Sequence, residues 1–254
     1  MTKYLQNPNG LSIAYNYLPG NDPAILFLPG FFSHMQGTKA LWLEQRCRER
    51  GQAFIRFDYR GHGESGGSFE EATITDWLDD TLLVLDRIAN GPVILVGSSM
   101  GGWISILAAL ARPEIVTGVV GIAAAPDFTQ MQIEEKLSES HKEELLKNGL
   151  FQQRSDYWDT PLTITRKLIE NGKHHGLLHR KSINLDIPVC LIHGKMDPDI
   201  PWETSLTLQQ IIGEDHCDVI LLPDGEHRLS REEDLVLIDR AVSNMTARSV
   251  DQPG

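Results

Sequence analysis

The chain alternates short runs of β-branched and aromatic residues with longer segments of helical period. Of its sequence features, this alternation most restricts the folds that the chain can adopt. The predicted helices are residues 39–51, 73–91, 101–113 and 201–213. The runs predicted as strands are residues 11–18, 24–30, 53–61, 93–99, 116–125, 187–194 and 217–225. Such alternation predicts an α/β fold in which helices cover both faces of a mostly parallel central sheet. Because ligands of these sheets bind at the carboxyl ends of the strands, the residues that follow each strand are the functional candidates.

One long interval departs from the alternation. Residues 127–185 contain no predicted strand but two charged amphipathic stretches, residues 131–149 and 160–179. An insertion of this length exceeds what a connection needs, and it begins where a strand ends. We therefore expect a single domain over residues 1–254 with a small helical cap at about residues 127–185. An extra packing layer without a gating role is the alternative.

Composition narrows the possible partners and the compartment. The 254 residues, 41% of them hydrophobic, suit one large core. Acidic residues outnumber basic ones by 35 to 23, so the formal charge of −12 argues against nucleic acid and membrane surfaces as partners. Three cysteines without metal-ligand spacing predict reduced thiols. The N-terminal residues have no features of a secretory or transit segment, which predicts a cytoplasmic location.

The run at residues 93–99 continues into Gly97-Ser98-Ser99-Met100-Gly101, a G-x-S-x-G pattern between a predicted strand and a predicted helix. A serine at such a sharp turn stands in strained backbone geometry, and the flanking glycines remove steric clashes. The pattern predicts Ser99 as a nucleophile. The helix N-terminus directs the Met100 N–H toward an oxyanion formed there. A glycine-rich turn without chemistry is the alternative.

A serine hydroxyl needs a base and an orienting acid before it can attack a carbonyl at neutral pH. Asp197 follows the predicted strand 187–194, and His227 follows the predicted strand 217–225. The order Ser, Asp, His, with each residue just past a strand, is the order expected for a nucleophile on this kind of sheet. We therefore predict Asp197 as the acid and His227 as the base.

Other titratable residues lie near the same strand ends. Asp199, two residues after Asp197, and Asp127, after an earlier strand, are the alternatives for the acid. His193 and His216 lie inside or beside strands, and we expect them to be core or edge residues rather than bases.

The second oxyanion donor is expected in the loop that follows residues 24–30. Gly30 lets the chain turn, so that the Phe31 N–H points into the pocket as the Met100 N–H does. The Phe31 ring, with Phe32, is a candidate for lining an acyl pocket. Ordinary core packing is the alternative for these rings.

Two patterns resemble cofactor or metal sites. Residues 61–66, Gly-His-Gly-Glu-Ser-Gly, match the dinucleotide pattern G-x-G-x-x-G. However, they do not open directly onto a helix, and the acidic residues around them would repel a pyrophosphate. The histidines at 174, 175 and 179 lack an acidic or cysteine partner at ligand spacing. We therefore expect no cofactor and no metal.

With these residues placed, the chain resembles the α/β-hydrolase superfamily in the segments LFLPGFF, FDYRGHGES, VGSSMGG, HGKMDPDIP and EHR. Within it, LPGFFSHMQGTKA, HHGLLH and PWETS resemble the family of α/β-hydrolase domain-containing protein 10, a mitochondrial family of animals. The resemblance implies an α/β-hydrolase fold and a serine hydrolase acting on acyl-protein thioesters and acyl glucuronides. It places the nucleophile, acid and base on Ser99, Asp197 and His227, in what we expect to be a bacterial relative.

Together these residues predict a serine hydrolase that cleaves esters or thioesters through an acyl-serine intermediate, with a small molecule or an acylated protein as substrate. Hydrolysis of a lipid, peptide or carbon–carbon bond on the same fold is one alternative, and a binding module without turnover is another. An anionic glucuronide needs a cation at the pocket. The candidates are Arg228, Arg166 and Lys173.

Overall fold

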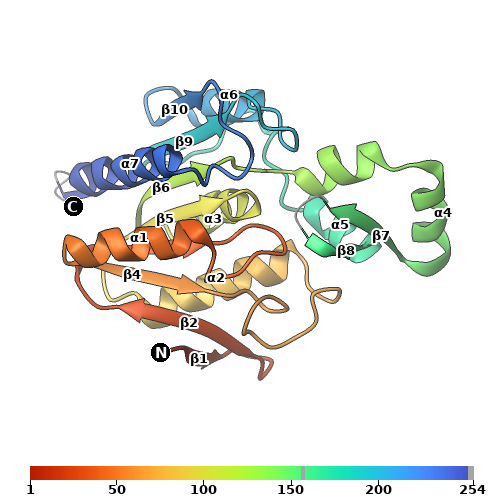
Figure 1. Cartoon of the computed structure of the whole chain (residues 1–254), viewed down its shortest axis with the longest axis horizontal. Helices are drawn as coiled ribbons and strands as arrows, with labels where there is room; N and C mark the ends of the chain where they lie inside the picture. The colour runs from red at the N-terminus through yellow and green to blue at the C-terminus, as the bar shows by residue number, and fades with distance from the viewer. Residues whose placement is uncertain (156–157, 251–254) are drawn as a thin grey trace.

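The computed structural model describes residues 1–155 and 158–250, and in that part of the chain eight strands form one sheet (Figure 1). In order across the sheet, the strands are β1 (Lys3–Gln6), β2 (Ser12–Leu18), β4 (Gln52–Phe57), β3 (Asn21–Leu28), β5 (Val93–Ser98), β6 (Val116–Ile122), β9 (Val189–Gly194) and β10 (Cys217–Leu222). β2 runs antiparallel to both of its neighbours, and the other neighbouring pairs are parallel. The mostly parallel sheet expected from the sequence is confirmed.

Helices cover both faces of this sheet, as the sequence predicts. On one face lie α1 (Thr38–Glu49) and α7 (Glu232–Val250), and on the other lie α2 (Ile74–Ile88), α3 (Met100–Ala111) and α6 (Glu203–Ile212). Alternate residues of one strand enter the two cores. In β5, Ile94 and Val96 join the core beneath α1 and α7, whereas Val93 and Leu95 join the core beneath α2 and α3. Burial on both faces explains why the central strands are continuous apolar runs in the sequence.

After β6 the chain leaves the sheet and builds a cap that projects to one side of the molecule in Figure 1. The cap consists of a π-helical turn (Thr129–Ile133), a short 3-10 turn (Glu134–Lys136), α4 (Glu139–Asn148), β7 (Leu150–Ser155), β8 (Trp158–Thr165) and α5 (Arg166–Lys173). Ser138 begins α4 by accepting the His141 N–H, and Gly149 ends it with a φ of 75°.

The cap is helical only in part, because β7 and β8 form an antiparallel hairpin where the sequence analysis expected helix and no strand. Phe151 of β7 pairs with Ile164 of β8, and both side chains are 1% exposed. Leu162 and Ile164 stand two residues apart, which is the period of a strand. This short alternation is followed directly by the helical period of α5. Residues 160–179 together therefore had a helical pattern in the sequence.

Two expectations about the whole chain concern membranes and thiols. Among the described residues, no helix combines the length and apolar character needed to cross a bilayer. Cys47, Cys190 and Cys217 are free and buried, as expected for reduced thiols. Burial raises the pKa of Cys47 and Cys217 to about 12 and that of Cys190 to about 11, which makes all three poor nucleophiles.

Candidate active site

Ser99 is the single residue between the end of β5 and the start of α3. Its φ of 54° and ψ of −120° lie outside the regions that serine normally adopts. A Cβ on Gly101 would lie 2.1 Å from the Leu28 carbonyl oxygen, and one on Gly97 would lie 2.2 Å from the Gly101 carbonyl oxygen. Only glycine therefore permits this close approach of β3, β5 and α3, which holds Ser99 on a sharp turn at the carboxyl edge of the sheet.

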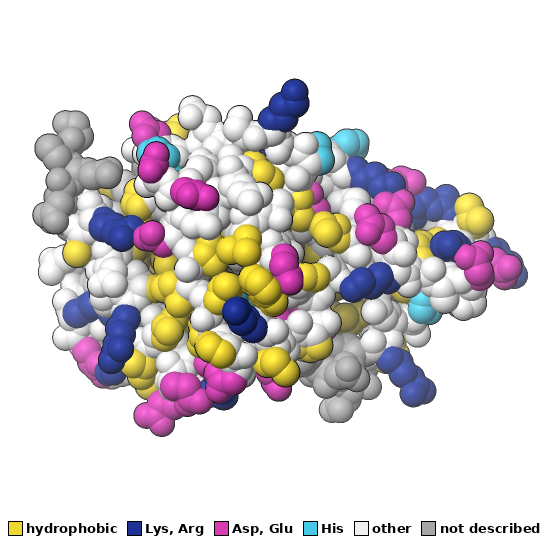
Figure 2. Space-filling model, turned by 90° about the horizontal axis from the view of Figure 1, so that it is seen from above, with side chains coloured by type: hydrophobic (Ala, Val, Ile, Leu, Met, Phe, Trp, Pro, Cys, Tyr) yellow, Lys and Arg dark blue, Asp and Glu magenta, His cyan; other side chains and the backbone are white. Residues whose placement is uncertain are grey.

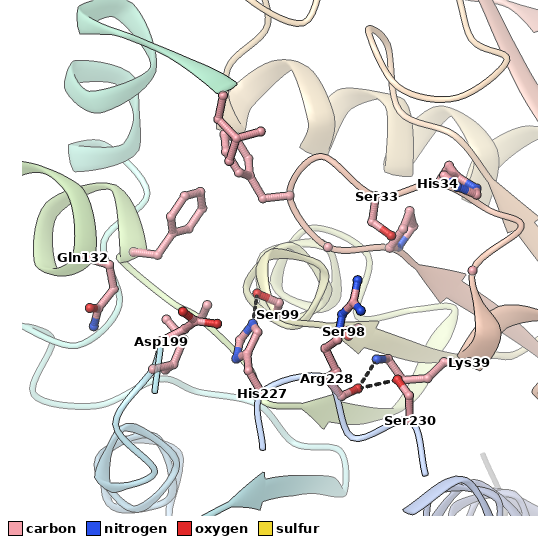
Figure 3. A pocket seen from close by; sticks show the side chains of 18 of the residues that line it. Ser33, His34, Lys39, Ser98, Ser99, Gln132, Asp199, His227, Arg228 and Ser230 are labelled. Atoms are coloured by element: carbon pink, nitrogen blue, oxygen red, sulfur yellow. Dashed lines mark hydrogen bonds between the residues drawn. The ribbon is translucent and has the colours of Figure 1, made fainter. Parts of the chain in front are cut away.

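The structure brings together Ser99, Asp197 and His227 from the loops that follow β5, β9 and β10. His227 Nε2 lies 3.1 Å from Ser99 Oγ, and His227 Nδ1 lies 2.7 Å from Asp197 Oδ2. Figure 3 shows the Ser99 hydroxyl against the edge of the His227 ring. In this arrangement Nε2 can accept the hydroxyl proton while the carboxylate holds the Nδ1–H.

Asp197 has a fixed and ionised carboxylate. Its side chain has no exposed surface, and its Oδ1 accepts the N–H groups of Asp199 and Ile200, each at 2.9 Å. Burial alone would raise its pKa, but hydrogen bonds from His193 and His227 outweigh burial and hold the pKa of Asp197 well below its usual range. The carboxylate therefore stays charged at neutral pH.

His193 is buried, as the sequence analysis expected, but it also contacts the acid. Its Nε2 lies 3.1 Å from Asp197 Oδ2 and 3.1 Å from the Ile200 carbonyl oxygen, while its Nδ1 lies 2.7 Å from Ser205 Oγ. Two acceptors around Nε2 place the proton on that nitrogen. His193 lies within β9 and Asp197 in the loop after it, so their spacing of four residues did not by itself indicate this contact.

The two alternatives for the acid, Asp127 and Asp199, have different surroundings. Asp127 accepts the Leu177 N–H at 2.8 Å and the Leu178 N–H at 3.0 Å, so its carboxylate fastens the end of the cap to the loop after β6. Asp199 lines the pocket beside His227 (Figure 3). His216 is exposed just before β10.

The two predicted oxyanion donors lie on either side of Ser99. A Cβ on Gly30 would lie 3.3 Å from Ser99 Cβ, so the loop after β3 passes directly over the nucleophile. Met100 begins α3, and its N–H is one of the unpaired donors of the helix N-terminus. Among residues 1–155 and 158–250, neither the Phe31 N–H nor the Met100 N–H has a hydrogen-bond acceptor. Both are available to an oxyanion.

A pocket of about 750 Å³ opens over Ser99 and His227. Its apolar lining comes from the loop after β3, the segment after β6 and the cap hairpin, namely Phe31, Ala125, Phe128, Ile133, Leu162 and Ile164. The Phe31 ring lies 5.2 Å from the Phe128 ring, centroid to centroid, so it both packs in the core and lines the pocket. The cap thus supplies one wall of the pocket above the nucleophile.

The charged lining is mostly basic and comes from two places: Lys136 and Arg154 belong to the cap, whereas Lys39 lies in α1 and Arg228 in the loop after β10. Among the described residues, the charged groups of the lining are Lys39, Lys136, Arg154, Arg228 and Asp199. Burial and the neighbouring Arg228 charge lower the pKa of Lys39 to about 8, and its Nζ donates to the Arg228 carbonyl oxygen (Figure 3). Of the three cations that the sequence analysis proposed, Arg228 lines the pocket. Arg166 and Lys173 do not, because Arg166 donates to the Leu145 carbonyl oxygen and Lys173 pairs with Glu134 at 2.6 Å.

The metal and dinucleotide patterns of the sequence lie in different parts of the structure. Among the described residues, the group with three possible ligand atoms within 4.8 Å of one another is Asp197, Asp199 and His227. Its Asp197–His227 pair is already joined by a hydrogen bond. The histidine cluster at 174, 175 and 179 forms no such group in the same part of the chain. The glycines of the G-x-G-x-x-G match serve a tight turn after β4.

Comparison with known proteins decides the family. A family model described as serine aminopeptidase, S33, matches residues 20–156. The palmitoyl-protein thioesterase ABHD10, mitochondrial, of Bos taurus is 39% identical over 243 residues, which cover 95% of this chain and 79% of the relative. This chain belongs to the α/β-hydrolase family. The resemblance seen in its motifs is confirmed, and the protein is a hydrolase.

Solved structures agree with this assignment. Mouse α/β-hydrolase domain-containing protein 10 matches the hydrolase with a TM-score of 0.89 and 37% identity, covering 98% of this chain and 99% of the mouse chain. A hydrolase from Agrobacterium vitis S4 matches with a TM-score of 0.92 and 38% identity, covering 97% and 98% of the two chains. The shared fold therefore extends over nearly the whole chain, the cap included.

Proposed function

We propose that this hydrolase cleaves carboxylic esters or thioesters through an acyl intermediate on Ser99. The observation that carries the proposal is the chain of contacts from Ser99 Oγ through His227 to the buried Asp197, at 3.1 Å and 2.7 Å. Two N–H groups available to an oxyanion flank this chain. Its bovine and human relatives, named palmitoyl-protein thioesterases, support a thioester among the substrates.

The proposed reaction has two halves. In the first, His227 Nε2 takes the Ser99 proton while Oγ attacks the acyl carbonyl, and the N–H groups of Phe31 and Met100 stabilise the oxyanion. Collapse of this intermediate breaks the bond to the leaving group, which receives the proton from His227. In the second half, water gives a proton to His227 and attacks the acyl-Ser99 ester. The acid is then released and Ser99 regains its proton.

The apolar and the basic residues of the lining suggest where the acyl chain and the leaving group of a substrate lie. We place the acyl chain against the apolar wall formed by Phe128 and the cap hairpin, because burial of methylene groups there is favourable. The leaving group then meets Lys39 and Arg228, which line the pocket outside the cap. A net positive lining in a chain with a formal charge of −12 favours an anionic leaving group, and this supports acyl glucuronides as a second substrate class.

The rest of the proposal concerns the partners, the location and the competing functions of the protein. We propose a small ester or an acylated protein as partner, without nucleic acid or membrane insertion, and a cytoplasmic location. Hydrolysis of a lipid, peptide or carbon–carbon bond, and binding without turnover, are the competing functions. The cap end of the face shown in Figure 2 carries Lys and Arg side chains among Asp and Glu, rather than one uniform basic patch.

Labelling with a fluorophosphonate tests the proposal directly. Intact mass is measured after treatment of the wild type and of Ser99→Ala, followed by rates on p-nitrophenyl esters, acyl thioesters and an acyl glucuronide. We expect one adduct on the wild type, none on the variant, and a loss of turnover of about a millionfold in Ser99→Ala. An adduct without multiple turnover on any substrate would favour a binding module. Equal rates for the two proteins would exclude Ser99 as nucleophile.

A further inference from the structure

The loop that carries the Phe31 N–H is a tight turn in a strained conformation. The Ser33 N–H donates to the Gly30 carbonyl oxygen at 3.1 Å, which closes a four-residue turn with Phe31 and Phe32 at its centre. Phe32 has a φ of 56°, in the left-handed region that favours glycine. A phenylalanine at this position makes the turn unfavourable on its own. Contacts from outside the turn therefore have to hold it.

His62 supplies one of these contacts. The Phe32 N–H donates to His62 Nε2 at 3.2 Å, and His62 Nδ1 lies 3.2 Å from the Arg60 carbonyl oxygen. Because a carbonyl oxygen only accepts, Nδ1 carries the proton and Nε2 is the acceptor. The ring is 4% exposed and packs edge-on against Phe69 and Trp77, with centroid distances of 5.1 Å and 5.3 Å. The imidazole therefore has one orientation and one tautomer.

We propose that His62 is a positioning residue for the oxyanion site, because its neutral ring holds the Phe32 N–H and thereby fixes the neighbouring Phe31 N–H over Ser99. The inference rests on the proposed function, since it concerns the same oxyanion. Phe31 lies between two held points: Gly30, which passes over Ser99, and Phe32, which His62 holds. Without the second point the turn can relax to a negative φ at Phe32, and the Phe31 N–H loses its fixed direction.

The surroundings keep His62 neutral and in place. Burial lowers its pKa to about 4, so the ring remains an acceptor at neutral pH. Gly61 and Gly63 on either side have φ values of 73° and 48°, and a Cβ on Gly63 would lie 2.1 Å from the Asp58 carboxylate. The Asp58 carboxylate accepts the Met35 N–H at 2.6 Å, three residues after Phe32. The segment after β4 thus accepts two hydrogen bonds from the loop after β3, one at His62 and one at Asp58.

Two substitutions at His62 separate the hydrogen bond from packing. His62→Phe keeps a ring in the aromatic cluster but removes the acceptor, whereas His62→Gln places a carbonyl oxygen near the position of Nε2. We expect kcat to fall about 10- to 100-fold in His62→Phe, with KM changed less than about threefold. We expect His62→Gln to retain kcat within about tenfold. Tyr59→Phe is the matched control, because Tyr59 packs 5.7 Å from His62 without a bond to the turn.

A trifluoromethyl ketone distinguishes positioning from general damage, since it forms a tetrahedral oxyanion on the serine. Its affinity should fall in His62→Phe in parallel with kcat/KM, while the affinity for the product acid stays unchanged. Equal loss of both affinities, or wild-type kcat in a folded His62→Phe, would overturn the inference. If neither variant folds, nitrogen NMR of the wild type decides, because a proton on His62 Nε2 at pH 7 would contradict it. Failure of the wild type to react with a fluorophosphonate would instead contradict the proposed function.

Discussion

Asp197 is the most constrained side chain of the site. Its Oδ1 accepts two backbone N–H groups, and its Oδ2 accepts from His227 and His193, so neither oxygen can turn away. A carboxylate fixed in this way selects the tautomer of His227 that carries its proton on Nδ1. Ser99 then faces the bare Nε2. The tautomer of His227 therefore follows from the packing of β9 and the loop after it.

Replacement of Asp197 by Asn tests whether the carboxylate sets the tautomer of His227. An amide can donate its NH2 to Nδ1 and so favour the wrong tautomer, which leaves Ser99 facing a protonated Nε2. We expect kcat to fall about 10³- to 10⁴-fold on a p-nitrophenyl ester at neutral pH. Asp199→Asn should lower kcat less than about tenfold, because Asp197 still holds His227 Nδ1 at 2.7 Å in this variant.

The relative size of these two losses is informative. If Asp199→Asn were the more damaging substitution, Asp199 would be the acid and the hydrogen bond between His227 and Asp197 would have another role.

At this scale the sequence located some residues and not others. Ser99, Asp197 and His227 each follow a strand, and parallel strands end at the same edge, so their order along the chain was enough to group them. His193 and His62 gave no such signal. The hydrogen bond of His62 joins it to Phe32, a residue of a different loop, and a buried histidine in a strand or turn has the same sequence pattern whether or not it holds a neighbour.

The hairpin β7–β8 is the element that gives the pocket its cap-side wall. Leu162 and Ile164 both line the pocket, as residues two apart on one face of β8 do. The sequence analysis expected a cap here but missed the hairpin. The strand period of β8 runs directly into the helical period of α5, so the two together have the pattern of one helical stretch. An element that lines the pocket over Ser99 was therefore not predicted from the sequence.

Substitution of Leu162 by Trp should shorten the acyl site. The larger ring would fill space on the apolar wall, so we expect KM for dodecanoyl and longer p-nitrophenyl esters to rise at least about tenfold. Rates on the acetyl ester should change less than about threefold. Thr163→Trp, one residue along on the other face of the strand, is the matched control. Equal effects on short and long esters would show that the acyl chain lies elsewhere.

Asp127 holds the cap at its other end. Asp127→Ala would leave the buried N–H of Leu177 and the half-buried N–H of Leu178 without their acceptor, so we expect the free energy of unfolding to fall by about 3 kcal/mol. Urea denaturation measures this loss. The turnover of a short ester should stay within about tenfold, because Asp127 does not touch His227. A loss of turnover of a thousandfold in folded protein would instead make Asp127 the acid.

At the scale of the whole molecule, the fold could be predicted from the sequence because its sheet is buried on both faces, which makes the central strands apolar runs. Seven of the strands are apolar or β-branched runs, most of them separated by helices, and the sequence predicted each of these seven. β1 was not predicted, since its four residues lie at the exposed edge and carry no apolar run. The helix α7 was also not predicted. Its first turn is Glu-Glu-Asp, and Leu235, Ile238, Val242 and Met245 recur at helical spacing on its buried face, so the sequence carried signals of this helix that the prediction did not use.

The stability of the whole chain should depend on pH through its buried histidines. His62 has a pKa of about 4 in the folded protein, below the ordinary histidine pKa of 6.5, because burial disfavours its charged form. The unfolded chain therefore binds more protons between these values, and stability is full above pH 6.5 and falls as the pH drops toward 4. A difference of this size corresponds to about 3 kcal/mol. Burial also lowers the pKa of His175, which adds to the same trend.

Urea denaturation at pH 7.0, 5.5 and 4.0 tests this dependence, with His62→Phe as the comparison. The wild type should lose about 3 kcal/mol of unfolding free energy across this range, and the variant should lose correspondingly less because phenylalanine takes up no proton. The carboxylates act differently. The lowered pKa of Asp197 costs stability only below about pH 4, while burial raises the pKa of Asp58 and opposes the loss. Parallel pH curves for the two proteins would mean that His62 is charged or exposed in the folded chain, and neither state is compatible with a ring that holds the Phe32 N–H.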